Sequence, residues 1–323
     1  MLRVLLVCLA VLLLVPSWAG SERLPLYRGT PVIHSRPVAL FPDDPKRVKN
    51  GVLTYLGGVE LQASDPAFGG FSALHVDGDR FTLLSDGGSL VRFRMGADWH
   101  VRDPQVTELA GPGTGWEKRD RDTESLALLP NGDMLVGYER HNQVWRFDRT
   151  LRPVAHAAPP LMKRWSDNSG AEAMALMPDK SVVVMSEAYL SPGKWGFVAL
   201  RFHGGDPTVA GARPSVFHYY PPLHYAVSDA AALPDGRLLV LTRSANIHDF
   251  FIVQLQVADI RNLKPGEGVK GKTVAIFKGP VLHDNFEGIA LTREGGRMIL
   301  WMVSDDNQSM FQRTYLLKFA LAY

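Results

Sequence analysis

The sequence predicts an all-β protein that folds as a single β-propeller of four-stranded blades. Three observations predict this fold class. A strand–turn–strand pattern recurs at intervals of about 50 residues, which is typical of one propeller blade. Each copy has a turn with hairpin chemistry, such as Asn131-Gly132. Each first strand also carries a small alanine, and these are Ala73, Ala127, Ala175, Ala231 and Ala290. Five copies predict five blades.

The alanine has a packing reason, because a larger side chain on an innermost strand would collide with its counterparts around a propeller axis. Ala127 and Ala175 are 48 residues apart, whereas the two later intervals are longer. A sixth, degenerate blade is therefore an alternative. Two stacked sheets would need Greek-key crossings, which the steady period disfavours.

The first 19 residues have the pattern of an export signal. Arg3 precedes an apolar run from Val4 to Val15, and small residues follow near Ala19. The run is shorter than the roughly 20 residues that span a bilayer. We therefore expect cleavage near Ala19, a periplasmic or secreted protein, and no membrane attachment after cleavage. Cys8 is the only cysteine and lies in this segment, so the mature chain has no thiol for a disulfide or a zinc site.

Two further regions are expected after the signal. Residues 20–50 are rich in proline and charge without a clear period, which indicates an extended N-terminal arm. Residues 51–323 form the propeller domain. The run at 52–56 has no blade of its own, and the last repeat reaches the C-terminus without a fourth strand. Pairing of these two segments would close the ring and hide both sheet edges.

The charge balance excludes one class of partner. The formal net charge is +2, and it becomes +1 once Arg3 is removed. A chain without a basic excess or blocks of like charge is not expected to bind nucleic acid. We expect a monomer that acts on a small anionic ester.

Acidic residues recur where the strands of a propeller meet one face. The first strand of a blade leaves this face and the second strand returns to it. Glu124, Glu172 and Glu287 each stand three residues before a repeat alanine, and Asp305 follows a second strand. Such carboxylates would repel one another unless a cation lay among them. They predict a divalent metal site, with calcium first and magnesium second. The alternative is that each glutamate caps a backbone or pairs with an arginine.

Other residues at the same face have chemistry suited to a reaction. Arg140 and Arg243 each end a second strand, where a guanidinium can hold an anionic substrate group. Glu139, Glu187 and His141 are candidate catalytic groups for proton transfer. Asp229 falls one residue later than the glutamates relative to its alanine, so we expect it on the other side of its strand. The serines show no glycine-flanked nucleophile elbow.

These motifs together resemble the phytase-like propeller proteins of bacteria, also described by their "esterase-like activity of phytase". The resemblance covers residues 69–319 and rests on the segments GGFSAL, DTES, GYERHNQVWRFD, NSGAEAMAL, VSDAAALPDGRLLVLTRS and DNFEGIAL. It implies an exported propeller with hydrolysis of a phosphate or other ester, and metal dependence by analogy with calcium-bearing propeller phytases. The family pattern usually reads Glu-Gly where this chain has Glu124-Ser125 and Glu172-Ala173, and Glu-Arg where it has Thr242-Arg243.

Two other functions remain open at this point. A lactonase-like propeller would also place carboxylate ligands around one calcium ion. A non-catalytic propeller would use the same face to bind a ligand or another protein. Fold alone does not decide among them.

Overall fold

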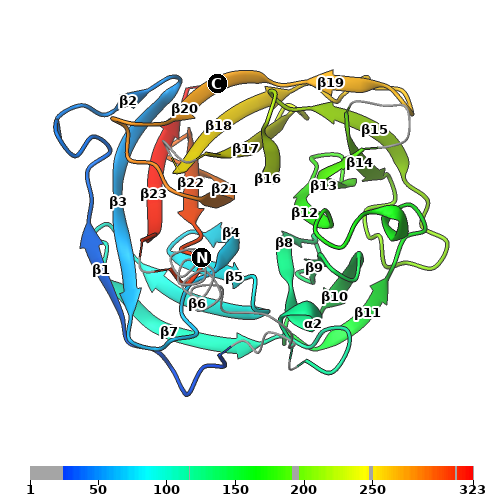
Figure 1. The fold of residues 1–323 in the computed structure, drawn as a ribbon, viewed down its shortest axis with the longest axis horizontal. Helices are drawn as coiled ribbons and strands as arrows, with labels where there is room; N and C mark the ends of the chain where they lie inside the picture. The colour runs from blue at the N-terminus through cyan, green and yellow to red at the C-terminus, as the bar shows by residue number, and fades with distance from the viewer. Residues whose placement is uncertain (1–24, 116, 191–195, 247–249, 310, 323) are drawn as a thin grey trace, which may run out of the picture.

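The computed structural model describes residues 25–115, 117–190, 196–246, 250–309 and 311–322. The expected signal, residues 1–19, lies outside these ranges. The strands form five sheets set radially around one axis, so the protein is a five-bladed β-propeller (Figure 1). The prediction of five blades is confirmed, and the described residues form no sixth sheet.

Each blade is one antiparallel sheet that starts at the axis. From the axis outward, blades 1 and 2 contain β4 (Phe71–Asp77), β5 (Arg80–Ser85), β6 (Ser89–Met95) and β7 (Val101–Glu108), then β8 (Thr123–Leu128), β9 (Met134–Tyr138), β10 (Gln143–Phe147) and β11 (Pro153–Ala157). Blade 3 contains β12 (Ala171–Leu176), β13 (Val182–Leu190), β14 (Phe197–Phe202) and β15 (Ser215–Tyr220), with β19 (Gly268–Lys270) parallel to β15. Blade 4 contains β16 (Ala226–Ala232), β17 (Leu238–Asn246), β18 (Phe250–Ala258) and β20 (Lys272–Phe277).

Blade 5 combines the two ends of the chain. It contains β21 (Phe286–Glu294), β22 (Arg297–Ser304), β23 (Thr314–Leu321), β3 (Leu53–Ala63) and β1 (Ile33–Pro37), while β2 (Lys49–Asn50) also pairs with β3. β3 pairs antiparallel with β23 along its length. The N-terminal strand therefore closes the ring, as predicted. β1 covers the outer edge of β3, so part of the segment at 20–50 is a strand of this blade.

The hydrophobic core is divided among the interfaces between neighbouring blades. Each of five clusters of buried side chains joins two adjacent sheets. Between blades 4 and 5, for example, Leu241 and Leu255 pack in the same cluster as Leu300 and Phe319. At the axis, β4, β8, β12, β16 and β21 surround the centre of the ring (Figure 1). Residues at the same level of these five strands therefore lie close together.

A β-bulge near the start of every innermost strand sets the direction of the side chains there. The pairing register shifts by one residue, which leaves one extra residue in each innermost strand. The extra residues are Ser72, Glu124, Glu172, Ser228 and Glu287. A bulge re-aims a side chain because the bulged residue is unpaired. The three glutamates thus occupy one equivalent position.

The bulges also correct the alignment of the first repeat. Ser72 is equivalent to Glu124, so His75 of β4 is equivalent to the repeat alanine Ala127. Ala73 is instead equivalent to Ser125, immediately after the bulge. The sequence pattern aligned Ala73 with the repeat alanines, although the equivalent residue is His75, two positions later. Ala73 and His75 were confused because alternate residues of a strand lie on the same face.

Helical structure is scarce in the described residues. α2 (Lys118–Arg121) is a single turn before β8, and η1 (Met162–Arg164) is a 3-10 turn before β12. None of the helices there has the length and apolar character needed to cross a bilayer.

Candidate functional site

Two rings of equivalent residues meet at one end of the propeller axis. The first ring consists of the bulged residues of the innermost strands. In each blade, the residue before the bulge pairs with a residue of the second strand, and the second ring consists of the next residue of the chain. These residues are Asp86, Glu139, Glu187, Arg243 and Asp305. Four of these five positions are acidic, and blade 4 places a guanidinium at the fifth. The propeller therefore gathers side chains from five distant segments.

Backbone hydrogen bonds fix the second ring against the first strand in several blades. The N–H of Asp86 donates to the carbonyl of Gly70 at 2.7 Å, and that of Glu139 donates to Asp122 at 2.8 Å. The N–H of Asp305 donates to the carbonyl of Asn285 at 2.9 Å. Because the same backbone hydrogen bond recurs in these three blades, Asp86, Glu139 and Asp305 have similar backbone positions relative to the first strand.

The rings line an open cavity of about 230 Å³. Its walls hold eight carboxylates and three cationic side chains, together with two asparagines. The lining residues are Asp86, Lys118, Asp122, Glu124, Glu139, Arg140, Asn168, Glu172, Glu187, Arg243, Glu287, Asp305 and Asn307. We call this space the acidic cavity.

Each cation of the acidic cavity already has a carboxylate partner. Lys118 Nζ lies 2.8 Å from Asp86 Oδ2, and Arg140 Nε lies 2.7 Å from Asp122 Oδ2. Arg243 contacts Glu187 and Glu287 through its two terminal nitrogens. Burial alone would lower the pKa of Arg243, but the charges of Glu172 and Glu187 raise it. The three cations therefore neutralise only part of the acidic charge.

Four carboxylates in the acidic cavity have no ion pair with any described residue: Glu124, Glu139, Glu172 and Asp305. Burial, Asp122 and Glu187 raise the pKa of Glu139 to about 8. Burial and Asp86 raise the pKa of Asp305 to about 7. Withdrawal from bulk water and like charges nearby also raise the pKa of Glu124 and of Glu172 well above the ordinary range. These raised pKa values follow from burial and from the excess of carboxylates over cations in the cavity.

Two of these acids, together with Asp122, are close enough to share one ion. One carboxylate oxygen each from Asp122, Glu124 and Glu139 lies within 4.8 Å of the others. Carboxylate oxygens are the ligands preferred by calcium and magnesium. Glu172, 5% exposed, faces the same cavity with no hydrogen bond from its side chain to a described residue. Asp122, Glu124 and Glu139 could therefore hold a metal ion.

The structure brings most of the predicted site residues together. Glu124, Glu172, Glu287 and Asp305, predicted as metal ligands, all line the acidic cavity, as do Glu139, Glu187, Arg140 and Arg243. The compact triad contains only Glu124 of the predicted ligand set. Glu287 is bound by Arg243, and it also accepts a hydrogen bond from Asn285 at 2.9 Å. Asp305 accepts one from the N–H of Asn307 at 2.6 Å.

Two predicted residues point elsewhere. His141 does not line the acidic cavity, and its Nε2 lies 3.4 Å from Asp120 Oδ1. Asp229 follows the bulge of β16 and turns toward blade 5, where it accepts the N–H of Ile289 at 2.7 Å. The expected turn of Asp229 to the other side of its strand agrees with this position.

Lys118 and Asn307 were not identified from the sequence, although both line the acidic cavity. Lys118 begins α2 in the connection between blades 1 and 2, and Asn307 lies in the loop between β22 and β23. Neither position repeats between blades. Lys118 carried no periodic signal, and of the loop after β22 only Asp305 was predicted as a site residue.

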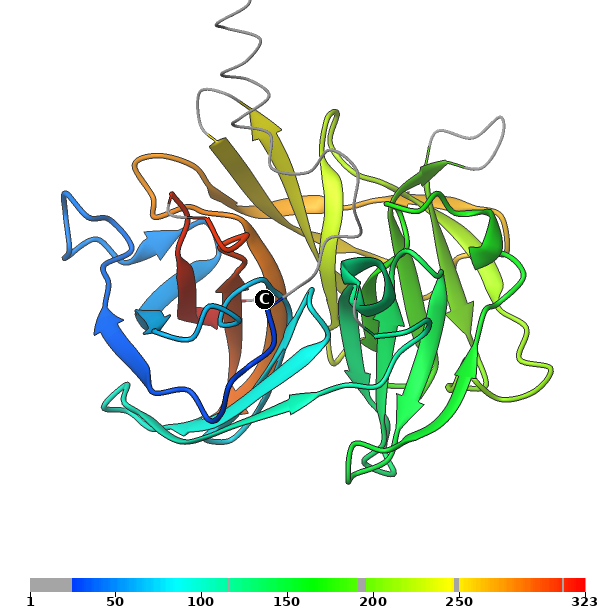
Figure 2. The same ribbon diagram turned by 60° about the horizontal axis from the view of Figure 1, so that its bottom comes forward.

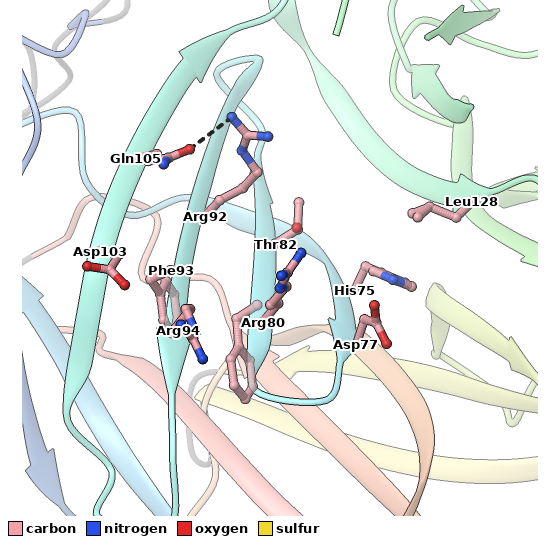
Figure 3. A pocket seen from close by; sticks show the side chains of 11 residues that line it. His75, Asp77, Arg80, Thr82, Arg92, Phe93, Arg94, Asp103, Gln105 and Leu128 are labelled. Carbon is pink, nitrogen blue, oxygen red and sulfur yellow. Dashed lines mark hydrogen bonds between the residues drawn. The ribbon is translucent and has the colours of Figure 1, made fainter. Parts of the chain in front are cut away.

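A larger cavity of about 610 Å³ lies between blades 1 and 2, toward the opposite ends of the strands (Figure 3). His75 and Arg92 face it, with Leu128 of blade 2 across the space. Arg92 donates to Gln105 at 3.4 Å, while Arg94 is bound to Asp79. The basic and acidic side chains that line this larger cavity are spread along a groove and form no cluster. Despite its size, this cavity lacks a cluster of unpaired carboxylates.

The sequence of the chain matches one family model. That model is phytase-like, described as esterase-like activity of phytase, and it matches residues 66–308. The chain belongs to the phytase-like family. The matched range includes every residue that lines the acidic cavity of this phytase-like propeller. No curated protein matches the chain.

Solved structures similar to this phytase-like chain share little sequence with it. A gluconolactonase, XC5397 from Xanthomonas campestris, has 14% identity and a TM-score of 0.44, with 94% of this chain and 97% of that chain covered. Virginiamycin B lyase from Staphylococcus aureus has 10% identity and a TM-score of 0.43, with 90% of this chain and all of that chain covered. These values support no inference about activity.

The structure also explains the departures from the Glu-Gly pattern of the phytase-like family. The residue after each bulge points toward the next blade. Ser125 there donates its hydroxyl to the carbonyl of Ala171 at 2.5 Å. In blade 5, a Cβ on Gly288 would lie 3.0 Å from the backbone of Ala73. Ser125 thus replaces close packing by a hydrogen bond to the next blade, while the preceding Glu124 still faces the acidic cavity.

Proposed function

We propose that this protein is a hydrolase of esters that uses a divalent cation, calcium first and magnesium second, held in the acidic cavity. Asp122, Glu124 and Glu139 would bind the ion. Export through residues 1–19 to the periplasm or the medium is part of the same proposal.

One observation carries the proposal. Four carboxylates face the acidic cavity without a cationic partner among the described residues, while all three cations are already paired. Buried acids in this state are costly at neutral pH unless they are protonated or bind a cation. A divalent ion in the triad would remove much of this cost.

The bound ion would polarise the ester oxygen and stabilise the charge that develops there during attack by water. Glu172 faces the cavity outside the triad, and the nearby ion would favour its carboxylate form, which would accept a proton from the attacking water. Arg243, fixed between blades 3 and 5, orients Glu187 and Glu287. Lys118 stays protonated, because Asp86 more than offsets the effect of burial and raises the pKa of Lys118. Lys118 can therefore contact an oxygen of the substrate.

A hydrolysis assay tests this function. The purified protein is treated with a chelator and then assayed with p-nitrophenyl acetate, p-nitrophenyl phosphate and δ-valerolactone, with and without added calcium. We expect calcium-dependent turnover of at least one ester, and a loss of roughly a hundredfold or more in kcat for Glu172→Gln. Glu267→Gln is the matched control, because Glu267 is exposed and its side chain accepts a hydrogen bond from the N–H of Lys264.

Each outcome of this assay is informative. Turnover of the lactone alone would select the lactonase-like function. No turnover of any ester, in a protein that still binds calcium, would contradict the hydrolase and favour a binding propeller. Equal activity with chelator and with calcium would contradict the metal-dependent mechanism.

A further inference from the structure

The three most exposed large apolar side chains of the described residues all lie at the face of the acidic cavity. Phe311 is 85% exposed, Leu223 is 83% exposed and Phe250 is 72% exposed. Leu223 precedes the first strand of blade 4, and Phe250 begins its third strand. Phe311 lies in the loop that starts at Asp305 of blade 5. We call these three residues the apolar rim.

The strand register links the apolar rim to the acidic cavity. Ala226 and Val253 pair with Arg243, which lines the cavity. Phe250 pairs with Asn246, three residues beyond Arg243 along β17. At about 3.3 Å per residue, Phe250 therefore lies roughly 10 Å beyond Arg243. Leu223 lies in the turn that leads into β16. Figure 2 shows the ends of β17 and β18 projecting past the neighbouring blades on this side.

The backbone holds this region in unusual conformations. Phe250 has a φ of 56° and His224, next to Leu223, has a φ of 67°. Asn307 and Gln308, in the loop of Phe311, have φ values of 48° and 49°. Non-glycine residues adopt such angles rarely, and a bulky residue does so only under strain. Strained backbone concentrates at ligand-binding sites.

Charged residues are few around the apolar rim. Residues 219–228, 250–258, 307–309 and 311–312 contain no Asp, Glu, Lys or Arg, while Asp249, Asp306 and Arg313 stand at the ends of these segments. The acidic cavity below them keeps an excess of carboxylates even with one divalent ion bound. A negatively charged substrate would therefore be repelled at the cavity.

Single exposed apolar side chains are ordinary on a protein surface, so exposure alone decides nothing. The distinguishing facts are the shared face, the strand register that links Phe250 to Arg243, the positive φ angles and the excess of carboxylates in the acidic cavity. From these we infer that the substrate is an uncharged ester with an apolar acyl or aryl group, whose ester bond enters the acidic cavity while the apolar group packs on Leu223, Phe250 and Phe311. This inference rests on the proposed function and narrows its substrate class.

A series of esters with increasing chain length tests the inference. The calcium-loaded protein is assayed with p-nitrophenyl acetate, butyrate and octanoate, and with p-nitrophenyl phosphate. We expect kcat/KM to rise with chain length and to be lowest for the phosphate. The double variant Phe250→Ser, Phe311→Ser should lose about tenfold in kcat/KM on the octanoate and little on the acetate. Val154→Ser and Val209→Ser, exposed near the opposite ends of their blades, are the matched controls.

The results separate the inference from the function on which it depends. No turnover of any ester would remove the proposed function itself. Turnover with the same chain-length dependence in the double variant would overturn only the role of the rim. A preference for p-nitrophenyl phosphate would overturn the uncharged substrate. Loss of binding to phosphatidylcholine vesicles in the double variant, with ester kinetics unchanged, would assign the rim to a lipid surface and overturn the inference.

Discussion

The guanidinium of Arg243 in blade 4 lies 3.2 Å from the carboxylate of Glu187 in blade 3, at equivalent positions of their blades. The same guanidinium contacts Glu287 of blade 5. One cation therefore joins three blades at the axis, whereas the other four blades place an acid at the position equivalent to Arg243. This arrangement gives Arg243 a structural role in addition to any contact with substrate.

Replacement of Arg243 should destabilise the protein. Arg243→Gln leaves Glu187 and Glu287 without their cation in a largely buried place, so we expect the free energy of unfolding to fall by about 3 kcal/mol. Urea denaturation of the chelator-treated protein at pH 7.5 measures this change. Arg237→Gln removes an ion pair to Asp235 on an exposed turn and should change stability by less than about 0.5 kcal/mol. Equal effects of the two substitutions would contradict the account.

The metal-free protein should become less stable as the pH rises. The pKa of Glu139 rises from 4.5 to about 8 in the folded protein, and that of Asp305 from 3.8 to about 7. The folded state therefore binds protons more tightly than the unfolded state, and the stability gained in this way is lost as the pH passes through these folded values. We expect the melting temperature in chelator to fall between pH 5 and pH 8.

Added calcium should flatten this pH dependence, because the ion replaces protons among the carboxylates. Glu139→Gln should reduce the slope, while Glu267→Gln should leave it unchanged. A melting temperature that rises steadily from pH 5 to pH 8 without metal would disprove the assignment of the raised pKa values.

Asp229 should stabilise the contact between blades 4 and 5. Its carboxylate accepts the N–H of Ile289 and the N–H of Ala230, both at 2.7 Å. An asparagine has only one acceptor oxygen, so Asp229→Asn leaves a buried N–H without its partner. We expect a loss of about 1–3 kcal/mol, measured by chemical denaturation. Ser228→Ala, at the adjacent buried position, makes no hydrogen bond through its hydroxyl and should be nearly neutral.

Gly170 should be needed to place Glu139. A Cβ at Gly170 would lie 2.5 Å from the Cα of Glu139 and 2.6 Å from its carbonyl oxygen. The backbone of Glu139 would have to move, so Gly170→Ala should cost about 1–3 kcal/mol and weaken calcium binding. Gly204→Ala has open space around the added methyl and serves as the control. Calcium affinity equal to that of the wild type in Gly170→Ala would contradict this role.

Repetition made much of the fold predictable from the sequence. The period, the hairpin turns and the unmatched strand at 52–56 predicted five blades and the closure by β3. The same repetition brought Glu124, Glu172 and Glu287 to one cavity. Residues at the same position of each repeat occupy equivalent positions around the axis. Residues far apart in the sequence could therefore be placed near one another without a prediction of the loop structures.

The unpredicted features arise where the repeats differ. The position of the bulge in β4 was not predicted, because Ala73 lies on the same face of the strand as His75, the residue equivalent to the repeat alanines. Lys118 enters the acidic cavity from a connection that belongs to one blade only. The pairing of Arg243 with both Glu187 and Glu287 depends on side-chain geometry across blades, which spacing does not specify. The compact triad depends on such geometry too.

Calcium titration of the chelator-treated protein by isothermal titration calorimetry tests the central claim most directly. The account predicts that calcium binds with release of protons near pH 7, because carboxyls with raised pKa values must lose them, and that Glu124→Gln lowers the affinity by tenfold or more. The matched Glu267→Gln should bind like the wild type. Absence of calcium and magnesium binding, or equal binding by the Glu124→Gln variant, would contradict a metal centre in the acidic cavity.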